Sequence, residues 1–140
     1  MSAVEDPVAG ILAALNEPQK EAAAHVHGPL IVLAGAGSGK TKMLTSRVAA
    51  LMLGQRVPGH QILAVTFTNK AAREMRERVE RTLHQASQGF WSAPEIGTFH
   101  AVCVRILRRE QARTPFTKPF VIYDDSDQLS LLKSVVQKLG

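Results

Sequence analysis

The chain has 140 residues, of which 45% are hydrophobic and 21% charged, a composition typical of a soluble protein with a single core. Its 17 Lys and Arg residues outnumber its 12 Asp and Glu residues, and the net charge of +5 favours a polyanionic partner. The single cysteine, Cys103, excludes an internal disulfide and a zinc finger, and no apolar run reaches the roughly 18 residues of a membrane span, so we expect a cytoplasmic protein without a membrane partner.

The segment from Leu15 to Gln19, Leu-Asn-Glu-Pro-Gln, precedes a short Ala-rich stretch and predicts the start of a helix. Asn16 or Glu17 suits the cap, and Pro18 suits the first turn. The amide of Gln19 is also able to pair with the donor and acceptor of an adenine edge, which gives this residue a second predicted role.

Four runs of strand length, three of them apolar and one a short strand candidate at Glu95 to Thr98, alternate with helical periods along the chain. The runs are Leu30 to Ala34, Ile62 to Phe67, Glu95 to Thr98 and Phe120 to Tyr123. The segments Lys40 to Leu53 and Asn69 to about Gln85 are predicted helices, and further helices follow Thr98 and Asp124. This alternation predicts βαβ units and therefore an α/β fold with a parallel sheet flanked by helices.

Three of these helices show an apolar stripe that we expect to be buried. The stripes consist of Ala72, Met75, Val79 and Leu83; of Phe99, Val102, Cys103, Ile106 and Leu107; and of Leu129, Leu132, Val135, Val136 and Leu139.

The loop from Ala34 to Thr41, Ala-Gly-Ala-Gly-Ser-Gly-Lys-Thr, joins the first run to the first of these helices. Glycines let backbone N–H groups approach phosphate oxygens, and the helix N-terminus adds a positive dipole end. Lys40 can reach the β and γ phosphates, and the Thr41 hydroxyl can ligate Mg²⁺. Ala34 stands where the pattern G-x-x-x-x-G-K-[ST] has its first glycine. The predicted phosphate site consists of Gly35, Ala36, Gly37, Ser38, Gly39, Lys40 and Thr41.

Two strand ends carry an aromatic residue beside small polar groups. The second run ends at Phe67 and is followed by Thr68, Asn69 and Lys70, and the third ends at Thr98 and is followed by Phe99 and His100. Such a group is able to stack bases of a single-stranded nucleic acid and bind its phosphates. Two alternatives stay open: Phe67 stacks on a base, or Phe67 is a core residue and Asn69 only a helix cap.

The Arg residues divide into two groups. Glu74 with Arg78 and Glu77 with Arg81 have the favourable i,i+4 order, which predicts a solvated, ion-paired helix face. A second set lacks matched acids and supplies candidate phosphate contacts: Arg105, Arg108 and Arg109.

The run from Phe120 to Asp125 allows two interpretations. Four apolar residues that end in Asp124 look like a Walker B strand, whose Asp holds Mg²⁺. Alternatively, Asp124 and Asp125 only open the last helix.

Together these motifs resemble the start of the UvrD/PcrA/Rep family of superfamily 1 DNA helicases. Leu15 to Gln19 resembles the Q motif, Ala34 to Thr41 motif I, Ala64 to Met75 motif Ia, and Gly97 to Arg108 the Thr-Phe-His segment that follows. The resemblance covers about Ile11 to Leu139. It implies an incomplete fragment of a RecA-like P-loop NTPase, with the first RecA-like domain over 1–119 and the start of an inserted helical subdomain over 120–140.

The resemblance also implies an activity. The parent protein is expected to use ATP and Mg²⁺ to move 3′ to 5′ along single-stranded DNA and to unwind duplexes in repair or replication. Its expected partners are single-stranded DNA, duplex junctions and the remaining motor domains of the parent chain. The Asp-Glu motif and the arginine fingers of the family are missing from these residues, so we expect little turnover by this chain alone.

Residue roles follow from the same resemblance. It implies adenine contact by Gln19, and phosphate and Mg²⁺ contact by the catalytic pair Lys40 and Thr41. Lys42 stands where the family usually has Arg, and it belongs to the expected nucleotide site. The expected DNA contacts are Phe67, Thr68, Asn69, Lys70, Thr98, His100 and Arg105. The resemblance argues against Asp124 as the Mg²⁺ ligand.

Two other functions stay open. One is a non-motor module that binds a nucleotide or a single strand. The other is a self-contained P-loop ATPase or kinase in which Asp124 is the Mg²⁺ ligand.

Overall fold

The structure, a computed structural model, describes residues 6–86, 89–115 and 120–139. The chain divides into two compact units, Met1–Val102 and Cys103–Gly140. The described residues form six α-helices, two short 3-10 helices and two paired strands, which confirms the α/β class. The expected domain boundary between residues 119 and 120 adjoins residues outside the described ranges and stays a prediction.

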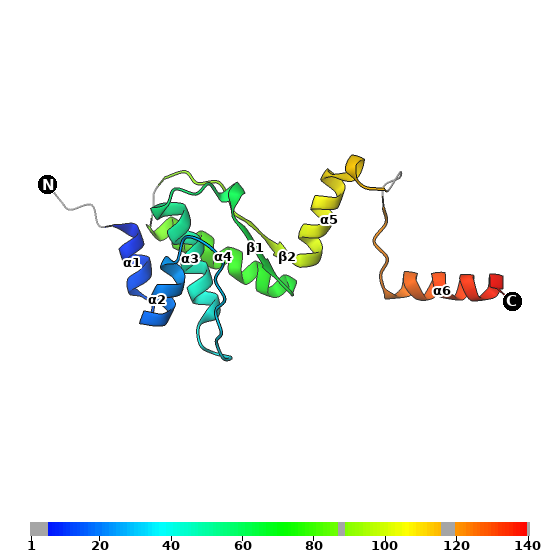
Figure 1. Cartoon of the computed structure of the whole chain (residues 1–140), viewed down its shortest axis with the longest axis horizontal. Helices are drawn as coiled ribbons and strands as arrows, with labels where there is room; N and C mark the ends of the chain where they lie inside the picture. The colour runs from blue at the N-terminus through cyan, green and yellow to red at the C-terminus, as the bar shows by residue number, and fades with distance from the viewer. Residues whose placement is uncertain (1–5, 87–88, 116–119, 140) are drawn as a thin grey trace. The chain divides into compact units, whose positions relative to one another are not determined.

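Figure 1 follows the elements in chain order. The first unit contains α1 (Pro7–Ala13), α2 (Glu17–Ala24), α3 (Lys40–Gly54), η1 (Gly59–Gln61), β1 (Leu63–Thr66), α4 (Asn69–Ala86), β2 (Glu95–Thr98) and the start of α5 (Phe99–Arg109). The second unit contains the rest of α5, η2 (Gln111–Arg113) and α6 (Asp125–Leu139).

β1 and β2 form a parallel pair in which Leu63 lies opposite Glu95 and Thr66 opposite Thr98. α4 connects them and packs against both strands. One predicted βαβ unit is therefore confirmed, with strand ends within one residue of the expected positions.

The main core lies between α3, α4 and the two strands. The predicted α4 stripe is buried as expected, and Val79 and Leu83 are fully buried. They pack in one cluster with Val48, Ala49 and Met52 of α3 and with Ile96 of β2. Burial of a Leu side chain stabilises a fold by about 1.5–3 kcal/mol, so this stripe fixes α4 on the sheet.

A smaller cluster holds α2 against α3. It contains Leu15, Ala22, Ala23 and Met43. The Arg47 guanidinium of α3 donates to the carbonyl oxygens of Ala22 and His25 at the end of α2. α2 and the first turns of α3 therefore form one body.

Gly59 and Ser92 meet just before the two strands begin. The N–H of Gly59 donates to Ser92 Oγ at 2.8 Å, and a Cβ at position 59 would lie 1.9 Å from the Ser92 carbonyl oxygen. The N–H of Glu95 then donates to the Ile62 carbonyl at 3.0 Å. The close approach of these two segments requires glycine at position 59, because any side chain there would collide with the backbone of Ser92.

Two of the four predicted strands are wrong. The runs Leu30 to Ala34 and Phe120 to Tyr123 join no ladder among the described residues. Ile31 and Leu33 are 85% and 92% exposed. An apolar run becomes a strand only when a neighbouring backbone pairs with it, and the described ladder pairs β1 with β2 alone.

The expected burial of the α5 stripe is confirmed only for Val102, and the expected burial of the α6 stripe is wrong. Both helices form, but Val102 is the one buried residue in the described part of α5, and no described residue of α6 is buried. Spacing creates an apolar face, whereas burial needs an element packed against it.

The predicted ion pairs on α4 are not formed. Among the described residues no ion pair joins Glu74 to Arg78 or Glu77 to Arg81. Another arginine of α4, Arg76, donates to the Ile96 carbonyl of β2 at 2.5 Å. An exposed ion pair gains little free energy, and this gain is offset by the entropy that the two side chains lose when they pair.

None of the described helices is long and apolar enough to cross a membrane.

Candidate functional site

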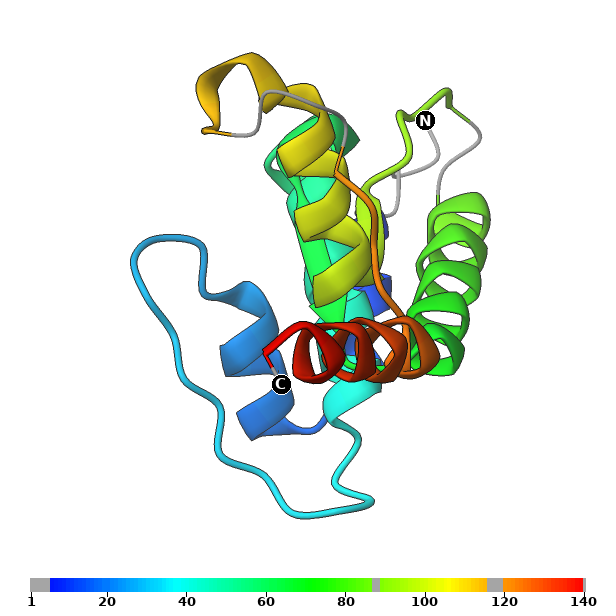
Figure 2. The same cartoon turned by 90° about the vertical axis from the view of Figure 1, so that its right-hand side faces the viewer.

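The glycine-rich segment forms the end of a long open loop between α2 and α3 (Figures 1 and 2). Gly37 and Gly39 have φ values of 75° and 80°, which side-chain-bearing residues rarely adopt. The Ser38 hydroxyl donates to the Gly35 carbonyl at 2.8 Å, closing a tight turn. Two glycines are thus required by the backbone alone.

α3 differs from the other described helices at its N-terminus. A side chain accepts a hydrogen bond from the first turn of each of the other five; these caps are Asp6, Asn16, Thr68, Thr98 and Asp124. Gly39 provides no such cap for α3. The first N–H groups of α3 are therefore available to an anion, at the positive end of the helix dipole.

Lys40 and Thr41 lie in the first turn of α3. The Lys40 ammonium turns back into the loop and donates to the carbonyl oxygens of Ala34 and Gly35, at 2.8 and 2.5 Å. The Thr41 side chain is exposed, and its hydroxyl has no partner among the described residues. A cation, free N–H donors and a free hydroxyl therefore meet at one loop, and these groups suit a phosphate chain with Mg²⁺.

Gln19 joins α2 to this loop. Its Oε1 accepts from the Asn16 N–H at 3.2 Å, and its own N–H donates to Asn16 Oδ1 at 3.0 Å. Its Nε2 donates to the Ser38 carbonyl at 2.8 Å. The helix start at Asn16 is confirmed, but the reciprocal capping box was not predicted. The spacing Asn-x-x-Gln is the sequence pattern from which this capping box could have been predicted.

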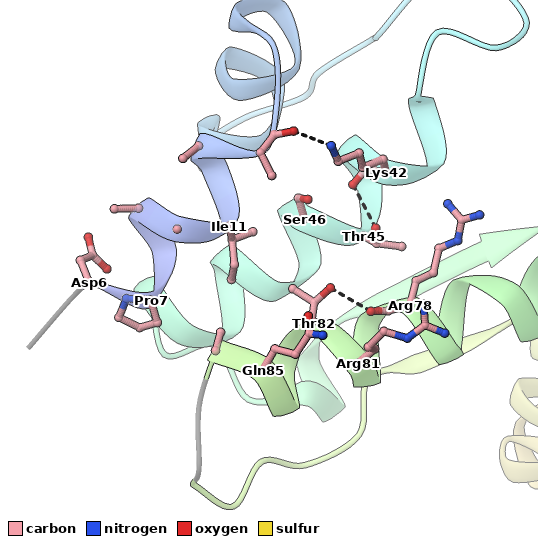
Figure 3. A pocket seen from close by; sticks show the side chains of 15 residues that line it. Asp6, Pro7, Ile11, Lys42, Thr45, Ser46, Arg78, Arg81, Thr82 and Gln85 are labelled. Atoms are coloured by element: carbon pink, nitrogen blue, oxygen red, sulfur yellow. Dashed lines mark hydrogen bonds between the residues drawn. The ribbon is translucent and has the colours of Figure 1, made fainter.

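Lys42 makes a different contact. Its Nζ donates to the Ala14 carbonyl at the C-cap of α1, at 2.5 Å. The side chain lines a pocket between α1, α3 and α4 (Figure 3). The place of Lys42 in the nucleotide site stays a prediction.

A second group of predicted residues lies at the carboxyl ends of β1 and β2. Phe67 is 87% exposed, so it is not a core residue. Its ring lies 5.3 Å from that of Phe99, with the planes tilted by 38°. Two aromatic faces are therefore presented together at one edge of the sheet.

Polar residues surround this aromatic pair. Thr68 Oγ1 accepts from the Ala71 N–H at 3.1 Å and Thr98 Oγ1 from the Ala101 N–H at 3.2 Å, so both threonines cap helices. Three exposed side chains follow in the first turns, namely Asn69, Lys70 and His100. The cap of α4 is thus Thr68 and not Asn69. Arg105 is exposed and lies further along α5, in the second unit.

Asp124 makes local contacts in the second unit. Its carboxylate accepts from the Asp127 N–H at 2.9 Å and from the Ser126 hydroxyl at 2.7 Å. The Asp127 N–H, and then the Ser126 hydroxyl, lower the pKa of this carboxyl. Asp124 therefore opens α6. Within the described ranges no cluster of three His, Cys, Asp or Glu residues is placed to hold a metal.

Comparison with known proteins adds a family-level finding. The profile described as "UvrD/REP helicase N-terminal domain" matches residues 15–140. The chain is 49% identical over 128 residues to the ATP-dependent DNA helicase PcrA of Bacillus subtilis, a match that covers 91% of this chain and 17% of the relative. It is 46% identical over 123 residues to the PcrA proteins of Staphylococcus aureus and Staphylococcus epidermidis, covering 88% of this chain and 16% of each relative. The chain thus spans about a sixth of the length of the relatives it matches.

Proposed function

Since the chain belongs to the UvrD/REP helicase family over residues 15–140, we propose that it is the N-terminal part of an ATP-dependent DNA helicase. In this proposal residues 1–119 begin the first RecA-like P-loop domain and residues 120–140 begin an inserted helical subdomain. The parent protein moves 3′ to 5′ along single-stranded DNA and unwinds duplexes during repair or replication. This chain contributes the phosphate site and part of the DNA site.

The uncapped start of α3 carries the proposal for ATP. Five described helices have a side-chain cap, whereas α3 begins at a left-handed glycine with Lys40 folded over the loop. A triphosphate would take the place of the Ala34 and Gly35 carbonyls as partner of the ammonium group. It would also accept from the free N–H groups of the first turn.

Thr41 is the residue proposed to hold Mg²⁺, because its exposed hydroxyl lies in the same turn as Lys40. Bound Mg²⁺ neutralises phosphate charge. Gln19 is proposed to contact adenine, and this role requires its side chain to exchange the Ser38 carbonyl for the base.

Calorimetry with ATP and Mg²⁺ tests the phosphate site. We expect a dissociation constant of about 10 µM to 1 mM, because these residues supply one side of the nucleotide cleft. Lys40→Ala should weaken binding further, and the exposed Lys133 in α6 offers a matched control, Lys133→Ala, that should leave it unchanged. Equal affinity of the Lys40→Ala and parent chains would contradict the assignment.

The exposed pair of Phe67 and Phe99 supports the proposal for single-stranded DNA. A base can stack on Phe67 because the ring is open to solvent directly after the end of β1. Lys70 and His100 supply cationic or hydrogen-bonding groups for the phosphates, beside the positive ends of α4 and α5. The parallel strands place both groups at the same edge.

Fluorescence anisotropy with a labelled oligonucleotide tests the DNA site. Phe67→Ala should weaken binding by about 1 to 3 kcal/mol, the value of one stacked base, without lowering the melting temperature. Phe90 is also fully exposed, so Phe90→Ala is the matched control and should bind normally. Binding should weaken as salt rises, because bound Lys and Arg release counterions. A Phe67→Ala chain that binds normally would remove Phe67 from the site.

A further inference from the structure

A pocket of about 980 Å³ lies between α1, α3 and α4 in the first unit (Figure 3). Its volume is at the upper end of the range of small-molecule sites, which is about 300–1,000 Å³. The α3 residues that line it, Lys42, Thr45 and Ser46, follow Thr41 on the same helix, and none of residues 34–41 lines the pocket. Apart from Lys42, which the family resemblance assigns to the nucleotide site, the lining residues have no role in the proposed ATP and DNA sites.

Most of the charged side chains that line the pocket are cationic. Lys42 lines it from α3, and Arg78 and Arg81 line it from α4. No described carboxylate forms an ion pair with either guanidinium. The single acidic residue of the lining is Asp6, whose Oδ1 accepts from the Val8 N–H. The pocket thus has an excess of uncompensated positive charge.

Ser46 adds a hydroxyl group to the lining of the pocket. This residue is only 7% exposed, it lines the pocket, and its hydroxyl has no hydrogen-bond partner among the described residues. The described buried side-chain atom that lacks a partner is His25 Nε2 and not Ser46 Oγ, so the Ser46 hydroxyl is accessible from the pocket and can donate to a ligand there. By contrast, the neighbouring Thr45 hydroxyl donates to the Lys42 carbonyl at 3.0 Å.

We propose that this pocket binds a small phosphate-bearing anion between Arg78, Arg81 and Ser46, separately from the loop at residues 34–41. Guanidinium groups pair with phosphate through two parallel N–H···O bonds, and a serine hydroxyl can donate a third. Arg78 and Arg81 are three residues apart on α4, so both side chains reach the same pocket. Lys42, which now holds the Ala14 carbonyl, adds positive charge at the α3 side.

Titration with pyrophosphate, followed by ¹⁵N NMR of the 140-residue chain carrying Lys40→Ala, tests the proposal. Lys40→Ala weakens the loop site, so the pocket can be observed separately. We expect shifts of the Ser46 and Thr82 amides, and an affinity at least about tenfold lower in the double variant Arg78→Gln, Arg81→Gln. Arg73 is exposed on the same helix but does not line the pocket, and Arg73→Gln should change affinity less than about twofold.

Three outcomes would overturn the proposal. Shifts confined to residues 35–41 would assign the phosphate to the loop. An equal loss from Arg73→Gln would mean general attraction to a basic helix. The same amide shifts from a dT8 oligonucleotide without a terminal phosphate, which pyrophosphate fails to displace, would assign the pocket to a nucleic-acid strand. Ser46→Ala, which retains all the charge, should still weaken pyrophosphate binding. Unchanged binding would remove the hydroxyl from the site.

Discussion

Gln19 has every polar group of its side chain engaged within the first unit. Its Oε1 accepts a hydrogen bond from the Asn16 N–H in the α2 cap, and its Nε2 donates to the Ser38 carbonyl of the loop. A Cβ on Gly39 would lie 2.6 Å from Gln19 Nε2, so the side chain also fills the space beside that glycine. In the described state Gln19 is therefore a brace of the loop.

Two substitutions separate the functions of Gln19. Gln19→Ala removes the cap and the brace, so it should lower stability by about 1 kcal/mol and speed amide exchange around Ser38. Gln19→Glu keeps the acceptor for Asn16 but loses the donor to Ser38. It should speed amide exchange in the loop while the melting temperature changes little. Hydrogen exchange that stays at the parent rate in both variants would show that Gln19 does not brace the loop.

Residue-level prediction was most successful where the backbone itself carries the information. The glycines at 37 and 39 and the cap at Asn16 follow from local conformation, which the sequence states directly. The orientations of Lys42 and Phe67 depend on tertiary neighbours. No local pattern predicts that Lys42 binds the Ala14 carbonyl or that Phe67 lies against Phe99.

At the scale of elements, Asp124 shows how a single cap can make one helix sensitive to pH. The carboxylate accepts hydrogen bonds that favour its charged form, and its pKa is lowered accordingly. The contribution of this cap to α6 is therefore complete above the ordinary pKa of an Asp, near about 4. It is lost as the pH falls through the lowered pKa.

The prediction for α6 is a pH-dependent helix start. Chemical shifts of residues 126–128 should lose helical character below about pH 4 in the parent chain. Asp124→Asn keeps an acceptor without a titrating group, so the same shifts should stay flat over that range. An identical pH profile in both chains would show that another carboxyl group is responsible.

DNA-stimulated ATP hydrolysis by this chain that disappears with Asp124→Asn would favour the alternative of a self-contained enzyme.

Element types were predicted better than their burial. The ends of α3, α4 and β2 agree with the expected positions within one or two residues, because caps and apolar spacing are local. Leu30 to Ala34 has the same apolar character as β1 but lacks a paired neighbour. Strand formation depends on a second segment, and a single run contains no information about that segment.

At the scale of the whole molecule, the chain combines a packed core with apolar side chains left in solvent. Val79, Leu83 and Ile96 are fully buried, while Ile31, Leu33 and much of the α6 stripe are exposed. Apolar residues of these two kinds should respond very differently to substitution, although hydropathy does not distinguish them.

Urea unfolding measures that difference, and the single tryptophan, Trp91, packs against the main core and reports on it. Leu83→Ala should lower the free energy of unfolding by about 2–5 kcal/mol, because it leaves a cavity. Ile31→Ser with Leu33→Ser should change it by less than about 0.5 kcal/mol and reduce binding of a hydrophobic dye. A large destabilisation by the serine pair would mean that the run is buried in solution.

The contact of Gly59 with Ser92 determines more than a local turn. Both residues precede the first pair of the ladder, and the N–H of Gly59 donates to Ser92 Oγ, so the two strands enter the sheet at a fixed offset. A slip of one residue would turn every β2 side chain to the opposite face. Gly59 therefore supports the register that brings Phe67 and Phe99 together at the opposite end of the ladder, whose four residue pairs span roughly 13 Å. Gly59 belongs to neither proposed binding site, yet it helps to set the strand register on which the contact between the two aromatic rings depends.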